Sequence, residues 1–166
     1  MSTLADRPTK LALRSAMEAR DMSAVLDAFA PEAIVRSPLT SRLTFQGHEQ
    51  IRALMEVIFE VIEDLRYTDE LQGPNSAVLV ASASVDGTDL EMVDHLRLNE
   101  DGKITEITVF FRPMPAIAVA MRAIGSALGR RKSAGRGRTI SVLTQPLGLM
   151  TEVGDRSGVR LVGPVL

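Results

Sequence analysis

The chain of 166 residues contains no cysteine and no tryptophan, and it has only one tyrosine. Without cysteine it can form no disulfide, no thiolate nucleophile and no thiolate ligand for zinc or an iron–sulfur cluster. Its two histidines show no spacing with acidic residues that is typical of a metal site, and no glycine-rich loop joins a strand to a helix. We therefore expect neither a metal nor another cofactor.

Long apolar runs are also missing, both the run of about 18 residues that a membrane helix needs and the shorter stretch of a secretory signal. We expect a cytoplasmic protein that does not enter a membrane. The hydrophobic content of 45% is nevertheless enough to bury one sizeable core. One globular domain is the expectation for this length.

Charge is unevenly distributed along the chain. Residues 1–129 hold 12 Lys and Arg against 19 Asp and Glu, a net charge of −7, whereas residues 130–166 hold 7 against 2, a net charge of +5. The run 130–138 carries five cations without interleaved aromatic residues, which indicates a solvated linker better than a nucleic-acid-binding arm. We predict a domain over 1–129, followed by a basic linker and C-terminal extension of unknown packing over 130–166.

Hydrophobic periodicity predicts both helices and strands within residues 1–129. The strongest helical pattern has apolar residues at 51, 54, 55, 58 and 59, and the clearest strand alternates Ala77, Leu79, Ala81 and later residues before the turn Asp86-Gly87. Helices are further expected at 8–20, at 23–29 and at 116–128. Strands are expected at 33–37, 43–45, 65–72, 77–85, 89–98 and 103–112. The pattern indicates an α+β fold whose last strands form an antiparallel meander.

Asp94 is the most informative residue of this pattern. Alternation along 89–98 places Asp94 on the same face as Met92 and Leu96, so a single carboxyl group lies on an otherwise apolar face. Loss of solvation raises the pKa of such a carboxyl group and favours a neutral acid that can donate a hydrogen bond. Asp94 is thus the candidate catalytic residue.

Two short motifs are similar to those of a known superfamily. Residues 45–51 read Phe-Gln-Gly-His-Glu-Gln-Ile, and Asp101-Gly102-Lys103-Ile104 precedes Val109-Phe110-Phe111. With the order of helices and strands, they resemble the nuclear transport factor 2-like superfamily, in particular its SnoaL-like and ketosteroid-isomerase-like branch. The resemblance implies a cystatin-like cone, in which a curved sheet wraps around N-terminal helices, with a C-terminal helix and an apolar pocket. It also implies a homodimer that packs through the outer face of the sheet.

The resemblance carries over only one catalytic residue. Asp94 lies where ketosteroid isomerases have an Asp that its apolar site keeps neutral. The isomerase's proton-shuttling Asp corresponds to Ser37 and its pocket Tyr to Leu13, while the acid that ends the strand in limonene epoxide hydrolases corresponds to Arg112. SnoaL-like cyclases use one pocket Asp as acid and base, and this is the family chemistry that Asp94 could support.

Two functions remain open. In the first, an enclosed pocket binds a small apolar carbonyl compound, with isomerase, cyclase or hydrolase chemistry at Asp94 and with Ser37 or Arg112 as polar helpers. In the alternative, the domain is a non-catalytic ligand-binding or dimerisation module, and Asp94 only accepts hydrogen bonds in the core. The expected pocket lining is Leu13, Met17, Ser37, Met55, Phe59, Leu79, Met92, Ile107, Val109 and Phe111.

Overall fold

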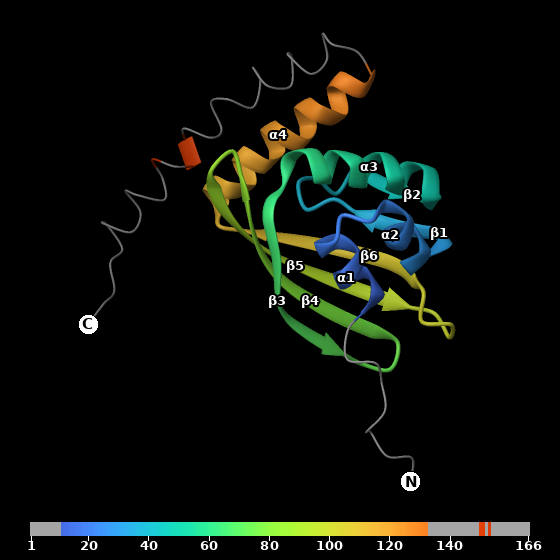
Figure 1. Cartoon of the computed structure of the whole chain (residues 1–166). Coiled ribbons are helices and arrows are strands. Elements are labelled where there is room, and N and C mark those ends of the chain that lie inside the picture. Colours follow the sequence, from blue (N-terminus) through green and yellow to red (C-terminus); the bar gives the residue numbers. More distant parts are fainter. Residues whose placement is uncertain (1–10, 133–149, 152, 154–166) are drawn as a thin grey trace, which may run out of the picture.

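The computed structural model describes residues 11–132 together with residues 150, 151 and 153. Helices and strands alternate along this part of the chain in an α+β order (Figure 1). The elements are α1 (Ala12–Glu18), α2 (Met22–Ala28), β1 (Phe29–Arg36), β2 (Thr44–Gln46), α3 (Gly47–Val61), β3 (Glu63–Gln72), β4 (Ser76–Val85), β5 (Thr88–Leu98), β6 (Ile104–Arg112) and α4 (Met114–Lys132). The α+β prediction is confirmed.

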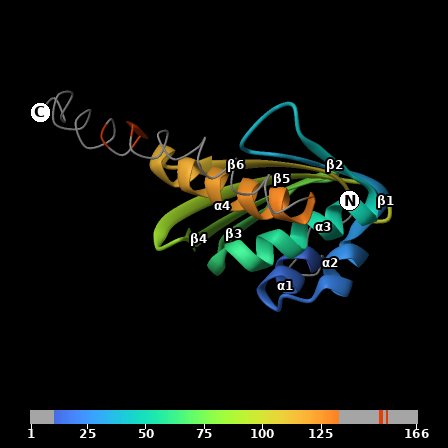
Figure 2. The same ribbon diagram turned by 90° about the horizontal axis from the view of Figure 1, so that it is seen from above.

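The six strands form one curved sheet in the order β2-β1-β6-β5-β4-β3. Strands β3 to β6 are an antiparallel meander, and β1 joins it as the parallel neighbour of β6. The helices lie on one face of this sheet, with α3 and α4 side by side across its opening (Figures 1 and 2). None of the helices in the described ranges is both long and apolar enough to cross a membrane.

The β4–β5 hairpin sets which side chains face the helices. Its turn residues Asp86 and Gly87 have φ of 48° and 72°, the left-handed values that a two-residue hairpin turn needs. On β4 every second residue is buried, from Ala77 through Leu79 to Val85, and the residues between them are half-buried on the outer face. The period of two that the sequence predicts for this strand is therefore confirmed, and the core lies on the helical side.

Local chemistry explains where the helices begin. The side chain of Asp21 accepts a hydrogen bond of 3.1 Å from the backbone N–H of Ala24, which caps α2. Gly47 opens α3 with φ of 75°, a conformation that residues with a side chain rarely adopt. Within α3, Ile51 and Val57 are fully buried, so the helix packs one face on the core.

The C-terminal helix continues beyond the boundary that the charge pattern suggests. Helix α4 runs to Lys132, and Arg130 and Arg131 lie in its last turn. Their guanidinium groups pair with Glu60 and Glu56 on α3, at 2.7 Å and 2.5 Å. The expectation that a solvated linker starts at residue 130 is thus wrong for these two residues, because α4 continues through them and both pair with acids on α3. The rest of the predicted linker and extension lies outside the described residues, apart from Lys132 and residues 150, 151 and 153.

Candidate functional site

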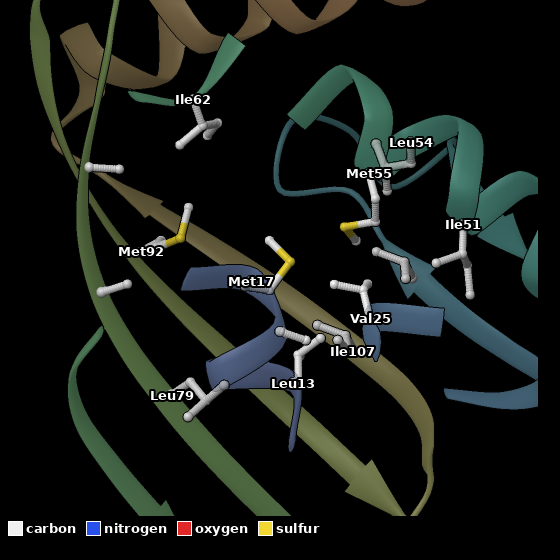
Figure 3. Packing of buried hydrophobic residues seen from close by; sticks show 14 of the residues in the cluster. Leu13, Met17, Val25, Ile51, Leu54, Met55, Ile62, Leu79, Met92 and Ile107 are labelled. Carbon is white, nitrogen blue, oxygen red and sulfur yellow. The ribbon is translucent and has the colours of Figure 1, made fainter. Parts of the chain in front are cut away.

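A cavity of about 350 Å³ lies between the concave face of the sheet and the helices. Its walls come from α1, α3 and α4, from all strands except β4, and from the loop that joins β1 to β2. Figure 3 shows Met17, Met55 and Met92 with their thioether ends turned toward the space between α1, α3 and β5. Almost all of the lining is apolar, and the volume falls in the range of small-molecule sites.

Asp94 is the carboxyl group in this wall. It lies on β5, directly opposite Leu79 of β4 and Val109 of β6, and its side chain points to the helical side of the sheet. Only 9% of the residue is exposed. Burial raises the pKa of Asp94 from 3.8 to about 7, because the carboxylate loses its hydration among apolar neighbours. Near neutral pH the group is therefore present in both protonation states.

Tyr67 is the second titratable group of the cavity, and its place there is not evident from the sequence. It lies on β3, is 6% exposed, and contributes to the cavity wall. Burial and the nearby Asp94 carboxylate raise the pKa of Tyr67 well above 10, so its hydroxyl keeps its proton and can donate a hydrogen bond. Within the described part of the chain, neither the Tyr67 hydroxyl nor the Asp94 carboxyl group has a hydrogen-bond partner. Both groups are available to a ligand.

Helix α1 is anchored next to Tyr67 by a polar cluster. Arg14 donates a hydrogen bond of 2.9 Å to the backbone carbonyl of Tyr67, and its guanidinium group lies 3.5 Å from Glu18 and 3.9 Å from Glu70. The carboxylate of Glu70 also accepts a hydrogen bond of 2.8 Å from the N–H of Leu11 at the start of α1. These contacts fix α1 against β3 and so position the helix that forms one wall of the cavity.

Helix α4 covers the opposite side. Met121, Ile124 and Leu128 line the cavity, as their shared helical stripe allows. Arg122 pairs with Asp86 of the β4–β5 turn at 3.0 Å, and the two pairs with α3 hold the other end of the helix. Exposed pairs of this kind contribute only about 0 to 1 kcal/mol each. Apolar packing therefore provides most of the attachment of α4.

Eight of the ten residues expected to line a pocket lie in the cavity wall. They are Leu13, Met17, Ser37, Met55, Met92, Ile107, Val109 and Phe111. Leu79 does not line it, because its side chain is fully buried in the sheet–helix core. Phe59 also lies outside the wall, since its ring packs against the guanidinium of Arg20, 5.8 Å from the ring centre, while Ile58 faces the cavity.

The two suggested polar helpers occupy different places. Ser37 lines the cavity, where its hydroxyl oxygen accepts a hydrogen bond of 3.1 Å from the N–H of Leu39. Arg112 lies on the outer face, where it pairs with Glu91 at 2.8 Å and its side chain is 75% exposed. Arg112 therefore cannot assist Asp94, because the sheet separates them.

The raised pKa of Asp94 predicts how stability depends on pH. In the folded protein Asp94 keeps its proton up to about pH 7, whereas the unfolded chain releases it near pH 3.8. The associated stabilisation is present below pH 3.8 and is lost as the pH rises through about 7, by roughly 4 kcal/mol in total. Urea unfolding across this range should show the loss in the wild type and not in Asp94→Asn. Asp101→Asn, which changes an exposed acid in the turn between β5 and β6, should follow the wild type. Parallel curves for the wild type and Asp94→Asn would show an ordinary pKa for Asp94.

Known proteins share this architecture. A steroid Δ-isomerase from Pseudomonas aeruginosa is 28% identical, with a TM-score of 0.61 over 73% of this chain and 86% of its own. An uncharacterised cystatin-like protein from Silicibacter pomeroyi is 21% identical, with a TM-score of 0.67 over 82% and 94%. A candidate polyketide cyclase from Sinorhizobium meliloti is 17% identical, with a TM-score of 0.51 over 59% and 89%. The last two likenesses concern the fold alone.

No curated protein matches the sequence significantly. A model of one family, the SnoaL-like domain, matches residues 11–107, which are more than half of the chain. This stretch includes the cavity walls from α1 to Ile107 in β6 and contains both Tyr67 and Asp94. The chain belongs to the SnoaL-like domain family, within the nuclear transport factor 2-like superfamily.

Proposed function

We propose that the protein binds a small apolar carbonyl compound in the cavity and that Asp94 performs acid/base chemistry on it. The observation that carries this proposal is the Asp94 carboxyl group, which is buried and has no hydrogen-bond partner among the described residues, in a wall that is otherwise almost entirely apolar. A buried polar group without a partner is costly, and a ligand that supplies the partner recovers that cost. An apolar molecule with one oxygen atom fits such a site.

The two polar groups can divide the chemistry between them. Tyr67 keeps its proton and can donate a hydrogen bond to the carbonyl oxygen, which stabilises negative charge that develops there. Asp94, with a pKa of about 7, can take a proton from the carbon next to the carbonyl as a carboxylate and return it as an acid. The steroid isomerase among the structural neighbours supports chemistry of this class. Because Ser37 stands where such isomerases have a second acid, Asp94 would have to serve alone.

The test uses benzylacetone, an apolar ketone, in deuterium oxide. The wild type should exchange the hydrogens next to the carbonyl for deuterium, which NMR detects. Asp94→Asn should exchange them about 100-fold more slowly, since general acid/base catalysis typically contributes that much or more, and yet still bind the ketone because Tyr67 still donates a hydrogen bond to its oxygen. Tyr67→Phe should weaken binding. Asp101→Asn, an acid-to-amide change in the exposed β5–β6 turn, should do neither.

Two results would argue against this assignment. Undiminished exchange by Asp94→Asn would show that Asp94 is not the acid/base group. Binding of the ketone without any exchange by the wild type would favour the alternative, a ligand-binding module without catalysis.

We also propose that two copies associate through the outer face of the sheet. The register aligns Val80 of β4, Val93 of β5 and Phe110 of β6 in one row across this face, and Leu71 lies beside Val78 in the next row. Phe110 is 56% exposed and Leu71 is 59% exposed, which is unusual for large apolar side chains on a sheet. This apolar patch is thus open to a partner.

Ion pairs border the apolar patch. Arg112 pairs with Glu91 at 2.8 Å, and Arg36 pairs with Glu106 at 2.9 Å. An apolar centre with a charged rim is typical of protein interfaces. A second copy can present the same patch. A two-fold axis through the centre of the patch would bring the charged rim of one copy against the charged rim of the other.

Phe110→Glu should convert the protein to a monomer, because it would place two charges in an apolar contact. Sedimentation equilibrium of the full chain measures the change. Met114→Glu, at an equally exposed apolar residue outside the patch, should leave the mass unchanged. A dimer that survives Phe110→Glu, or a monomeric wild type, would contradict the proposal.

A further inference from the structure

The cavity contains an acid but no base to neutralise it. Of the described residues that line it, none is Lys, Arg or His, and Asp94 and Tyr67 are its titratable groups. The nearby cations already pair with other acids: Arg14 with Glu18 and Glu70, and Arg122 with Asp86. An ionised Asp94 is therefore a buried negative charge without a protein counter-ion, and a ligand could supply one.

The walls around Asp94 suit the hydrocarbon part of a cation. Phe45 on β2, Tyr67 on β3 and Phe111 on β6 bring three aromatic rings to the same cavity. The faces of aromatic rings attract cations, most strongly where water is excluded. Four methionines, three of which converge in Figure 3, add polarisable and flexible surface that adapts to alkyl groups of different shape. The four are Met17, Met55, Met92 and Met121.

We infer that the cavity also binds hydrophobic monoamines as ammonium ions, with the nitrogen at the Asp94 carboxylate and the hydrocarbon against the aromatic and methionine walls. This inference rests on the same cavity as the proposed function but requires no catalysis. The ligand carries a single charge because the cavity holds a single carboxyl group, so polyamines do not fit it. Hydrophobic anions are excluded by the same carboxylate.

The two ligand classes differ in how they depend on the protonation state of Asp94. An ammonium ion pairs with the carboxylate, so its affinity rises with pH through about 7, the pKa of Asp94. A ketone is uncharged and accepts its hydrogen bond from Tyr67, which stays protonated, so its affinity does not rise with pH. The groups that face Asp94 from the neighbouring strands do not change their charge over this pH range. Leu79 of β4 and Val109 of β6 do not titrate, and Tyr67 of β3 stays protonated. From α1, Arg14 and Glu18 face Tyr67, and no titratable residue of α3 or α4 lines the wall.

The test compares two probes with one carbon skeleton: benzylacetone and the amine in which NH2 replaces its carbonyl oxygen. Isothermal titration calorimetry of the full chain measures both at about pH 5.5 and about pH 8.5. The amine should bind at least about tenfold more tightly at the higher pH, because only there is Asp94 mostly ionised, and the ketone should show no such increase. Asp94→Asn should lose the amine and keep the ketone, and Asp101→Asn, at an exposed acid in the β5–β6 turn, should match the wild type.

The possible failures can be told apart. An amine that does not bind, or that binds Asp94→Asn as well as the wild type, overturns this inference and leaves the ketone result intact. A ketone that does not bind, with the amine bound as described, overturns the proposed function instead. The pH dependence in the wild type decides the matter even where Asp94→Asn does not fold.

Discussion

The hydrogen-bonded ladder of β4, β5 and β6 determines everything else in this molecule. Because side chains alternate across a strand, the register that pairs Leu79, Asp94 and Val109 commits all three to the helical face. A register shift by one residue would turn His95, instead of Asp94, to the helical face and would expose the apolar residues to water. The apolar residues of β4 and β5 thus keep Asp94 on the helical face, although burial there disfavours its ionised form. The domain keeps a costly group in the wall of its cavity.

The cavity exists because the helices are held at the rim of the sheet and do not fill it. On one side Arg14 ties α1 to β3 through a backbone carbonyl and two carboxylates. On the other side α4 rests on α3 and on the β4–β5 turn. Four flexible methionines and six leucines are among the 24 residues that line the space between. Polar contacts at the periphery and adaptable side chains in the middle suit a site for small apolar molecules.

Much of the fold could be predicted from the sequence, because period and turn chemistry are local. The alternation on β4, the Asp86-Gly87 turn and the inward direction of Asp94 all follow from neighbouring residues. The details of the site could not be predicted from the sequence, because they depend on packing between distant elements. Leu79 and Val109 share a face with Asp94, yet only Val109 reaches the cavity. Tyr67 escaped notice because register shifts interrupt β3 on both sides of it and break the alternation.

The end of α4 shows a further limit of prediction from the sequence. When charge is considered alone, the clustered cations at 130–132 indicate a linker. The acidic partners of Arg130 and Arg131 lie some 70 residues earlier in the chain, on α3.

The single tyrosine has a different consequence. With no tryptophan in the chain, the ultraviolet fluorescence of this protein comes from Tyr67, a residue in the cavity wall beside a carboxyl group that titrates near neutral pH. The protein therefore carries an optical reporter inside its own binding site, without any label.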